Sequence, residues 1–266
     1  MLNNCYLWAS LAGHMGISEN NLNDKDGIVF LADVHLTGSR PDREERFIRF
    51  LEGLHGRIGA LYILGDLFDF WVGPRHVRLP EHARVLSELR RLHSSGVEIV
   101  FLHGNRDFHV GAAFERATGA RVYPNGVSLT LGGKRAYLTH GDLLCTRDSR
   151  YHQFTAIIRS APVKKLFQLL PYRLSCYLAG GYRSHSRRAT RRKPARVRGL
   201  VMKSVAAAFR KGFEVLVCGH VHPPGGPYMR TIKVDGKPRT LYVLGEWESG
   251  GSYLEYSGGR FELHTL

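Results

Sequence analysis

Five short apolar runs in this chain each end in a small polar loop rich in Asp, Asn and His, and this arrangement limits the possible folds most strongly. The runs are IVFLA (28–32), ALYIL (60–64), VEIVFL (97–102), RAYLT (135–139) and EVLVC (214–218). Helical patterns at about 41–54 and 80–94 separate the first three, a rhythm typical of α/β proteins with buried strands. Ligand sites in open α/β sheets lie beyond the carboxyl ends of strands, so we expect these loops to converge.

The later strand-like runs follow one another closely and are separated by Gly-rich turns such as Gly132-Gly133 and Gly258-Gly259. They predict a second, more antiparallel β half. We interpret the basic stretch at about 148–212, with its helical patterns, as an insertion that caps the α/β body. The predicted organisation is an N-terminal extension (1–26) and one domain (27–266). The extension lacks the basic start of a signal peptide, so we expect a cytoplasmic protein.

The charge of the chain is concentrated in that insertion. Lys and Arg total 38 against 23 acidic residues, a net charge of +15, and residues 149–213 hold 16 of the basic residues and no acid. The rest of the chain is close to neutral. Such a segment must meet an anionic partner or face solvent, and the candidate partners are nucleic acid, a lipid surface or a phosphorylated substrate.

The polar loops offer a set of candidate metal ligands: Asp33, His35, Asp66, Asn105, His140, His220 and His222. Alternation along an extended backbone puts Asp33 and His35 on one side, and likewise His220 and His222. Carboxylate, imidazole and amide donors without thiolate suit Mn²⁺, Fe²⁺ or Zn²⁺. A carboxylate such as Asp66 can bridge two ions, which in two-metal sites lie ~3.5–4 Å apart. Any single motif could be a solvated turn or a helix cap, but core packing does not explain all five in order.

The ordered series D-x-H, G-D-x-x-D, G-N-x-[DE], H-G-D and G-H-x-H resembles the signature of the calcineurin-like metallophosphoesterases. Stretches such as FLADVHL, ALYILGDLFDFWVG, VFLHGNRDFHVG and CGHVHPP resemble, more narrowly, the UDP-2,3-diacylglucosamine hydrolases of lipid A biosynthesis. The resemblance implies an α/β fold, a two-sheet β-sandwich flanked by helices with a basic helical lid. It also implies two Mn²⁺ ions per chain. One ion would be bound by Asp33, His35, Asp66 and His222, and the other by Asp66, Asn105, His140 and His220.

The same resemblance implies water attack on the α-phosphorus of the UDP unit, with Asp66, His140 and Arg106 as catalytic residues. Most of the superfamily has His where Arg106 stands, and Arg there is typical of the hydrolase family. The alternative for Arg106 is a salt bridge to Asp107 or Asp69. The implied substrate-binding residues are Asn105, Arg106, Asp148, Ser186, Thr190, Lys193 and His220.

The insertion has two parts with different alternatives. Residues 159–178 combine apolar residues at helical spacing with a basic margin and are interrupted at Pro171. Such helices suit a lipid interface or an apolar chamber, unless they simply pack within their own domain. Residues 183–198 contain eight Lys or Arg, which indicates an anionic membrane, a nucleic acid or a solvated face. Tyr182 is the nearby aromatic residue, so stacking of bases is weakly supported.

The expected function is therefore hydrolysis of a UDP-linked acylated glucosamine by a monomer that is peripheral on the cytoplasmic face of the inner membrane. A two-metal phosphodiesterase acting on nucleic acid or a soluble nucleotide is the alternative. A third hypothesis, a non-enzymatic adaptor built on an inactive phosphoesterase scaffold, would require a missing ligand, and the series of motifs is complete.

Overall fold

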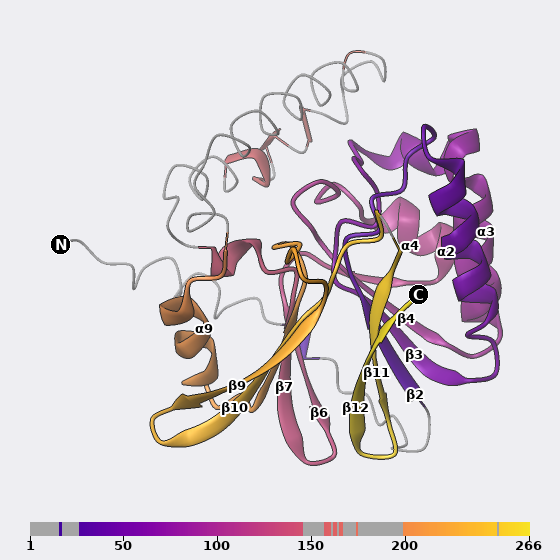
Figure 1. Ribbon diagram of the computed structural model, residues 1–266. Coiled ribbons are helices and arrows are strands. Elements are labelled where there is room, and N and C mark those ends of the chain that lie inside the picture. Colours follow the sequence, from indigo (N-terminus) through magenta and orange to yellow (C-terminus); the bar gives the residue numbers. More distant parts are fainter. Residues whose placement is uncertain are drawn as a thin grey trace.

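The computed structural model describes residues 16–17, 27–145, 157–160, 162–163, 165–166, 174, 199–248 and 250–266. Within these residues the strands form two six-stranded sheets. The first sheet has the order β12-β11-β2-β3-β4-β5, and the second has the order β1-β6-β7-β8-β10-β9. The sheets face each other, with helices on their outer sides (Figure 1). The predicted two-sheet α/β sandwich is thus confirmed, and its lid lies mostly outside the described residues.

The first sheet consists of β2 (Gly27–Leu31), β3 (Ile58–Ile63), β4 (Glu98–Leu102), β5 (Arg121–Tyr123), β11 (Ser252–Ser257) and β12 (Arg260–Thr265). Strands β2 to β5 are parallel, because the helices α2 (Pro41–Glu52), α3 (Pro80–Ser94) and α4 (Ala112–Thr118) make the crossovers. The helices α2 and α3 match the predicted ranges 41–54 and 80–94. Each has a proline in its first turn, where the missing N–H costs nothing.

The second sheet consists of β1 (Gly16–Ile17), β6 (Val127–Leu131), β7 (Lys134–Thr139), β8 (Val215–Cys218), β9 (Tyr228–Val234) and β10 (Lys237–Val243). The hairpins β6–β7 and β9–β10 are antiparallel, as the Gly-rich turns predict. However, β8 lies parallel to both β7 and β10. The hairpin β11–β12 leaves this half altogether and pairs antiparallel with β2. The expected more antiparallel second half is therefore found in its three hairpins, whereas the parallel pairing of β8 was not expected.

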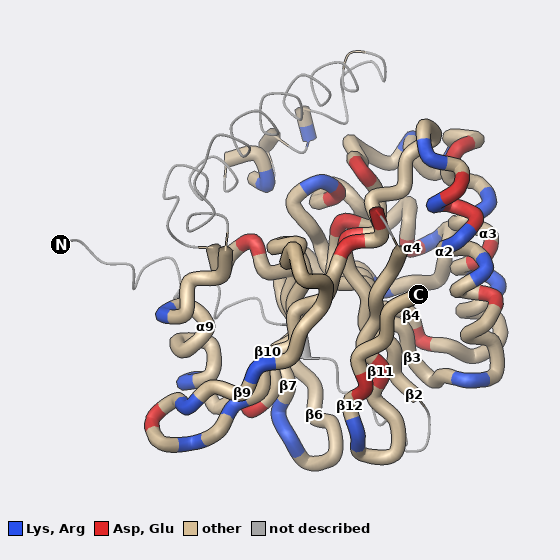
Figure 2. The backbone as a smooth tube through the Cα atoms, viewed as in Figure 1, with Lys and Arg blue, Asp and Glu red and all other residues tan. Residues whose placement is uncertain are grey.

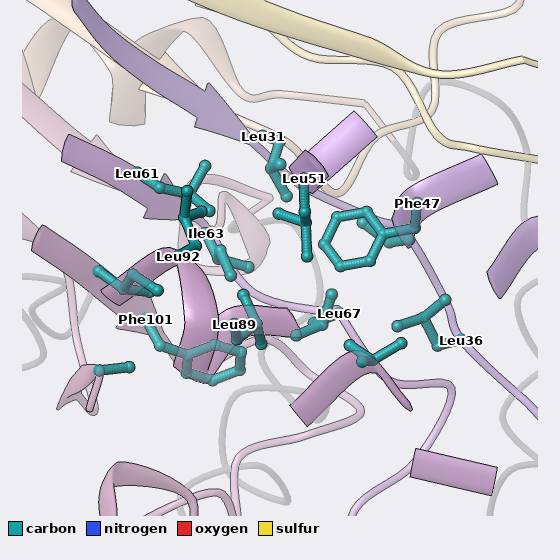
Figure 3. Packing of buried hydrophobic residues seen from close by; sticks show 14 of the residues in the cluster. Leu31, Leu36, Phe47, Leu51, Leu61, Ile63, Leu67, Leu89, Leu92 and Phe101 are labelled. Atoms are coloured by element: carbon teal, nitrogen blue, oxygen red, sulfur yellow. The ribbon is translucent and has the colours of Figure 1, made fainter. Parts of the chain in front are cut away.

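Burial on both faces explains why the central strands are continuously apolar. In β3, Leu61 and Ile63 face α2 and α3, whereas Ala60 and Tyr62 face the other sheet. Figure 3 shows Leu61 and Ile63 against side chains of α2 and α3. A third cluster lies between β8, β10 and α9 (Met202–Phe209).

Two short 3₁₀ helices, η1 (Pro74–Arg78) and η2 (Asp142–Leu144), complete the described elements. The part of the chain that the structure describes contains no helix with the length and apolar character needed to cross a membrane.

The aromatic cluster beside α3 contains a buried histidine that should make stability pH-dependent. His82 stacks on Trp71 with ring centroids 5.6 Å apart and lies 4.8 Å from the Phe68 ring. Burial lowers the pKa of His82 to about 4. The unfolded chain, with an ordinary histidine pKa, takes up this proton at a higher pH. The contribution of the neutral His82 to the free energy of unfolding is therefore fully present above about pH 6.5 and is lost as the pH falls toward 4.

We expect His82→Phe to remove this dependence. The loss in unfolding free energy between pH 7 and pH 4 should be smaller by roughly 3 kcal/mol than in the wild-type chain. Urea unfolding of both proteins in the presence of a chelator measures the difference. Titrating groups remote from His82 cancel in the comparison, whereas the adjacent His76, whose pKa is lowered by burial and in part by His82, contributes to it. An identical pH dependence in the two proteins would show that His82 has an ordinary histidine pKa in the folded chain.

Candidate metal centre

The polar loops converge because they follow the carboxyl ends of parallel strands at the same edge of the two sheets. Loops after β2, β3 and β4 come from the first sheet, and loops after β7 and β8 come from the second. The Asp33 carboxylate accepts a hydrogen bond from the backbone N–H of His220 (2.7 Å), which joins the loops across the two sheets. Figure 2 shows acidic residues gathered in these loops where the two sheets meet.

Two glycines make the close approach of the loops possible. A Cβ atom at Gly104 would collide with the Asp66 carboxylate, and one at Gly219 would collide with the Asp33 carboxylate. The G-N and G-H motifs therefore need glycine because any larger residue would push the neighbouring loop away, whether or not the glycine also forms a turn.

Five of the predicted ligands have a left-handed backbone that residues with a side chain rarely adopt. The φ angles are positive at Asp33 (57°), His35 (53°), Asp66 (54°), His220 (72°) and His222 (42°). Among the described non-glycine residues, Asp235 in the β9–β10 turn is the other example. Such conformations cost of order 1–3 kcal/mol each and cluster at functional sites. The surrounding fold must therefore hold these five residues in place.

Asp33, His35 and His222 form the first group of possible ligands. The Asp33 Oδ1 atom lies 3.2 Å from His222 Nε2 and 3.8 Å from His35 Nε2, and the two Nε2 atoms are 3.5 Å apart. One donor atom from each of the three residues lies within 4.8 Å of the others. Asp33 Oδ1 is buried with no hydrogen-bond partner among the described residues. A buried acceptor in this state fits a cation, because desolvation of an unpaired carboxylate oxygen is costly.

The nearby imidazoles also control the ionisation of Asp33. Burial acts to raise its pKa, but the positive charges of the neighbouring imidazoles, that of His222 first, outweigh burial and hold the pKa well below its usual range. Asp33 is therefore a carboxylate at neutral pH, as a metal ligand must be.

His140, Asn105 and His220 form the second group, with Asp66 beside it. The Asn105 Oδ1 atom lies 2.9 Å from His140 Nε2 and 2.8 Å from His220 Nδ1, and these two nitrogens are 3.2 Å apart. The Asp66 Oδ2 atom is 3.8 Å from His140 Nε2. Asp66 also links the two groups, because one donor atom from each of Asp33, Asp66 and His140 lies within 4.8 Å of the others.

The ring of His140 is oriented by the backbone. Its Nδ1 atom lies 2.9 Å from the carbonyl oxygen of Leu64, so an N–H on Nδ1 donates to that carbonyl. In a neutral ring the lone pair of Nε2 then faces Asn105 Oδ1, which is also an acceptor. Two acceptors at this distance require a proton or a cation between them. This donor set therefore fits a divalent metal.

Asp66 lies between the two groups. Its Oδ2 atom is 3.9 Å from His35 Nδ1 in the first group and 3.8 Å from His140 Nε2 in the second. Burial raises its pKa despite the opposing charges of His140 and Arg106. Its position agrees with the bridging role that the sequence suggested, a role that stays a prediction.

Arg106 has the salt bridge that sequence analysis raised as the alternative, but with a different second partner. One terminal nitrogen lies 2.6 Å from Asp69 Oδ1, and Nε lies 3.3 Å from Asp66 Oδ2. The side chain is one-quarter exposed at the edge of the site. Asp107 does not pair with this side chain. Instead its carboxylate accepts three backbone N–H bonds, from Asp66, Gly104 and Phe68.

Sequence reasoning missed three residues that organise the site. Asp107 joins the loops after β3 and β4, and the G-N-R-D motif carried a signal for it. Glu246, in the stretch YVLGEWES, lies 2.5 Å from His222 Nδ1. Arg159 donates to Asp142 Oδ2 (2.8 Å) and to the Gly104 carbonyl (3.0 Å). The charge of Arg159 outweighs burial and lowers the pKa of Asp142 to about 2.

Four of the predicted substrate contacts, Asp148, Ser186, Thr190 and Lys193, lie outside the described residues. Of the other predicted contacts, Asn105 and His220 belong to the second group, and the backbone N–H of Arg106 donates to Asp66 beside it.

Comparison with known proteins defines the class. The family model described as calcineurin-like phosphoesterase matches residues 27–224. The chain therefore belongs to the calcineurin-like phosphoesterase family. Together, the family and the donor groups indicate a divalent metal ion.

Curated relatives narrow the comparison. The chain is 34% identical to the UDP-2,3-diacylglucosamine hydrolase of Proteus mirabilis, over 88% of this chain and 97% of the relative. It is 35% identical to the protein of that name from Aeromonas salmonicida, over 90% and 93% of the two chains. It is 36% identical to the one from Vibrio cholerae, over 86% and 94%. These relatives confirm the resemblance drawn from the motifs.

Proposed function

We propose that this chain hydrolyses the pyrophosphate bond of UDP-2,3-diacylglucosamine, a step of lipid A biosynthesis, to give UMP and 2,3-diacylglucosamine 1-phosphate. The observation that carries the proposal is similarity to hydrolases of that name along nearly the whole length of each relative. The two groups of possible ligands in the loops after the strands supply the metal donors that such a hydrolysis needs.

We propose that this site holds two metal ions, with Mn²⁺ as the activating metal. One ion would be held by Asp33, His35, Asp66 and His222, and the other by Asp66, Asn105, His140 and His220. Bound divalent ions would supply Lewis-acid polarisation of the phosphoryl group and a water of lowered pKa. Asp66 supports the assignment of a shared ligand, because its carboxylate faces an imidazole of each group.

The residues of the chain have separate roles in this reaction. The Arg106 guanidinium, always protonated, would bind the pyrophosphate and stabilise the charge that develops on it. The leaving group is a sugar phosphate of low basicity, so it departs without a proton from a general acid. Arginine in place of histidine at position 106 is therefore compatible with this substrate. Asp148, Ser186, Thr190 and Lys193 would contact the glucosamine and its phosphate.

The insertion would supply the acyl-binding part. The backbone N–H of Val201 donates to the Leu144 carbonyl (3.1 Å), so the chain returns to the body close to where it left. Helix α9 packs on the second sheet through Val205, Ala208 and Phe209. These contacts support a lid that comprises the part of the predicted range 148–212 that precedes α9.

The direct test is incubation of the full chain with UDP-2,3-diacylglucosamine and Mn²⁺, followed by mass analysis. UMP and the acylated sugar phosphate are the expected products, and in ¹⁸O-labelled water the label should enter UMP, because water attacks the α-phosphorus. A parallel incubation uses single-stranded DNA. Cleavage of the DNA with the sugar nucleotide left intact would contradict the proposal.

We also propose that the chain associates as a monomer with anionic membranes through residues 183–198. Binding to vesicles containing phosphatidylglycerol should weaken strongly as the salt concentration rises from 50 to 500 mM, because exposed charges are screened. Replacement of Arg187, Arg188, Arg191 and Arg192 with Gln should have a similar effect. Sedimentation of the protein with the vesicles measures the association. Binding that is indifferent to salt would argue for an apolar contact.

A further inference from the structure

His222 lies between the first metal group and a carboxylate outside that group. Its Nε2 atom faces Asp33 Oδ1 at 3.2 Å and His35 Nε2 at 3.5 Å. Its Nδ1 atom lies 2.5 Å from Oε2 of Glu246. We propose that Glu246 is a positioning residue for metal binding, which holds the Nε2 lone pair of His222 toward the metal. This inference rests on the metal site of the proposed function.

The physical effect follows from the two nitrogens of imidazole. A neutral ring carries one proton, and a carboxylate at Nδ1 accepts that N–H and leaves Nε2 free to coordinate. Hydrogen bonds of this kind fix the tautomer and ring orientation and increase the basicity of the ligand. Without Glu246, the ring of His222 could rotate or place its proton on Nε2. Either change removes one ligand from the group.

The loop that carries Glu246 is itself held firmly. The neighbouring Trp247 is fully buried, donates its backbone N–H to the Asp33 carbonyl (3.2 Å), and packs edge-on against Phe47 and Phe50 of α2. Arg46 of α2 donates to the Gly250 carbonyl (2.7 Å). The backbone of Glu246 is therefore fixed relative to Asp33, so this part of the loop does not have to be ordered when metal binds.

In the second group, the ring of His140 is oriented by a backbone group instead of a carboxylate. His140 donates to the backbone carbonyl of Leu64, which no side-chain substitution removes. Removal of the Glu246 carboxylate should therefore weaken the Asp33, His35 and His222 group and leave the His140 group intact.

Calorimetric titration of Mn²⁺ into the metal-free full chain tests the inference without substrate. Glu246→Ala should weaken binding about 10–100-fold, the range observed when outer partners of metal ligands are removed. Glu246→Gln should lose less affinity, because its amide oxygen still accepts the N–H. The matched control is Glu248→Gln, which removes the same charge from an exposed position on the same loop. Its affinity should equal that of the wild-type chain.

Two outcomes would overturn the inference: unchanged affinity in Glu246→Ala, or an equal loss in Glu248→Gln, which would indicate a general charge effect. Thermal unfolding in a chelator checks the fold, and if Glu246→Ala does not unfold cooperatively, Glu246→Gln against Glu248→Gln decides the question. Failure of the proposed function looks different. In that case the wild-type chain binds Mn²⁺ and depends on Glu246, yet leaves the sugar nucleotide intact.

Discussion

Purified Asp66→Asn protein is expected to lose hydrolysis of UDP-2,3-diacylglucosamine almost completely at saturating Mn²⁺. The carboxylate of Asp66 faces His35 in one group and His140 in the other, so its charge serves both. An amide cannot supply an anionic oxygen to each side. We expect kcat/KM to fall roughly a thousandfold or more, comparable to or larger than the loss of a preorganised electrostatic group at an active site. Release of UMP measures the rate.

The fold should survive this substitution. Asparagine tolerates the left-handed conformation at position 66 and keeps an oxygen that can accept the N–H of Arg106. Asp235→Asn is a matched control, because Asp235 has nearly the same φ (50°) but lies exposed in the β9–β10 turn. The control should have wild-type activity. Substantial turnover by Asp66→Asn would mean that Asp66 is not the shared ligand.

Arg106→Ala is expected to reduce kcat/KM on the order of a hundredfold while Mn²⁺ affinity remains close to that of the wild-type chain. The guanidinium contacts Asp66 and Asp69 but is not a metal donor, so its loss removes a positive charge from the edge of the site. Steady-state kinetics and calorimetric titration of Mn²⁺ separate the two effects.

Asp69→Asn distinguishes a role toward substrate from a structural salt bridge. If Arg106 serves mainly to pair with Asp69, removal of either partner should reduce the rate equally. If Arg106 stabilises the pyrophosphate, Asp69→Asn should cost much less, because the guanidinium remains. A wild-type rate in Arg106→Ala would show that Arg106 has only a structural role, through its salt bridges.

The local sequence predicted the elements near the site well. Burial on both faces made β2, β3 and β4 recognisable as continuous apolar runs, and the ranges of α2 and α3 follow from helical periodicity. The pairing of β11 with β2 was not predictable in the same way. A β-hairpin carries information about its own turn but none about which distant strand edge it joins.

The candidate site shows the same division. The sequence alone identified Asp33, His35 and Asp66 as candidate donors, because donor chemistry is a property of the side chain. It also contains the glycines, Gly104 and Gly219, at which neighbouring loops approach closely. Which nitrogen of His140 and of His222 is left available to a metal depends on tertiary contacts with Leu64 and Glu246. Likewise, Asp107 could not be identified as the acceptor for three backbone N–H groups until the loops came together.

The sequence by itself determined the donors, their order along the chain and the strands that carry them, since periodicity and side-chain chemistry are local. The family resemblance implied that the donors divide into two groups that share Asp66. Only the tertiary structure decided how far apart these donors lie and which acceptors orient the rings of His140 and His222. Those properties depend on distances between segments as far apart as β2 and β8. The packing of the two sheets sets these distances, and no local pattern encodes them.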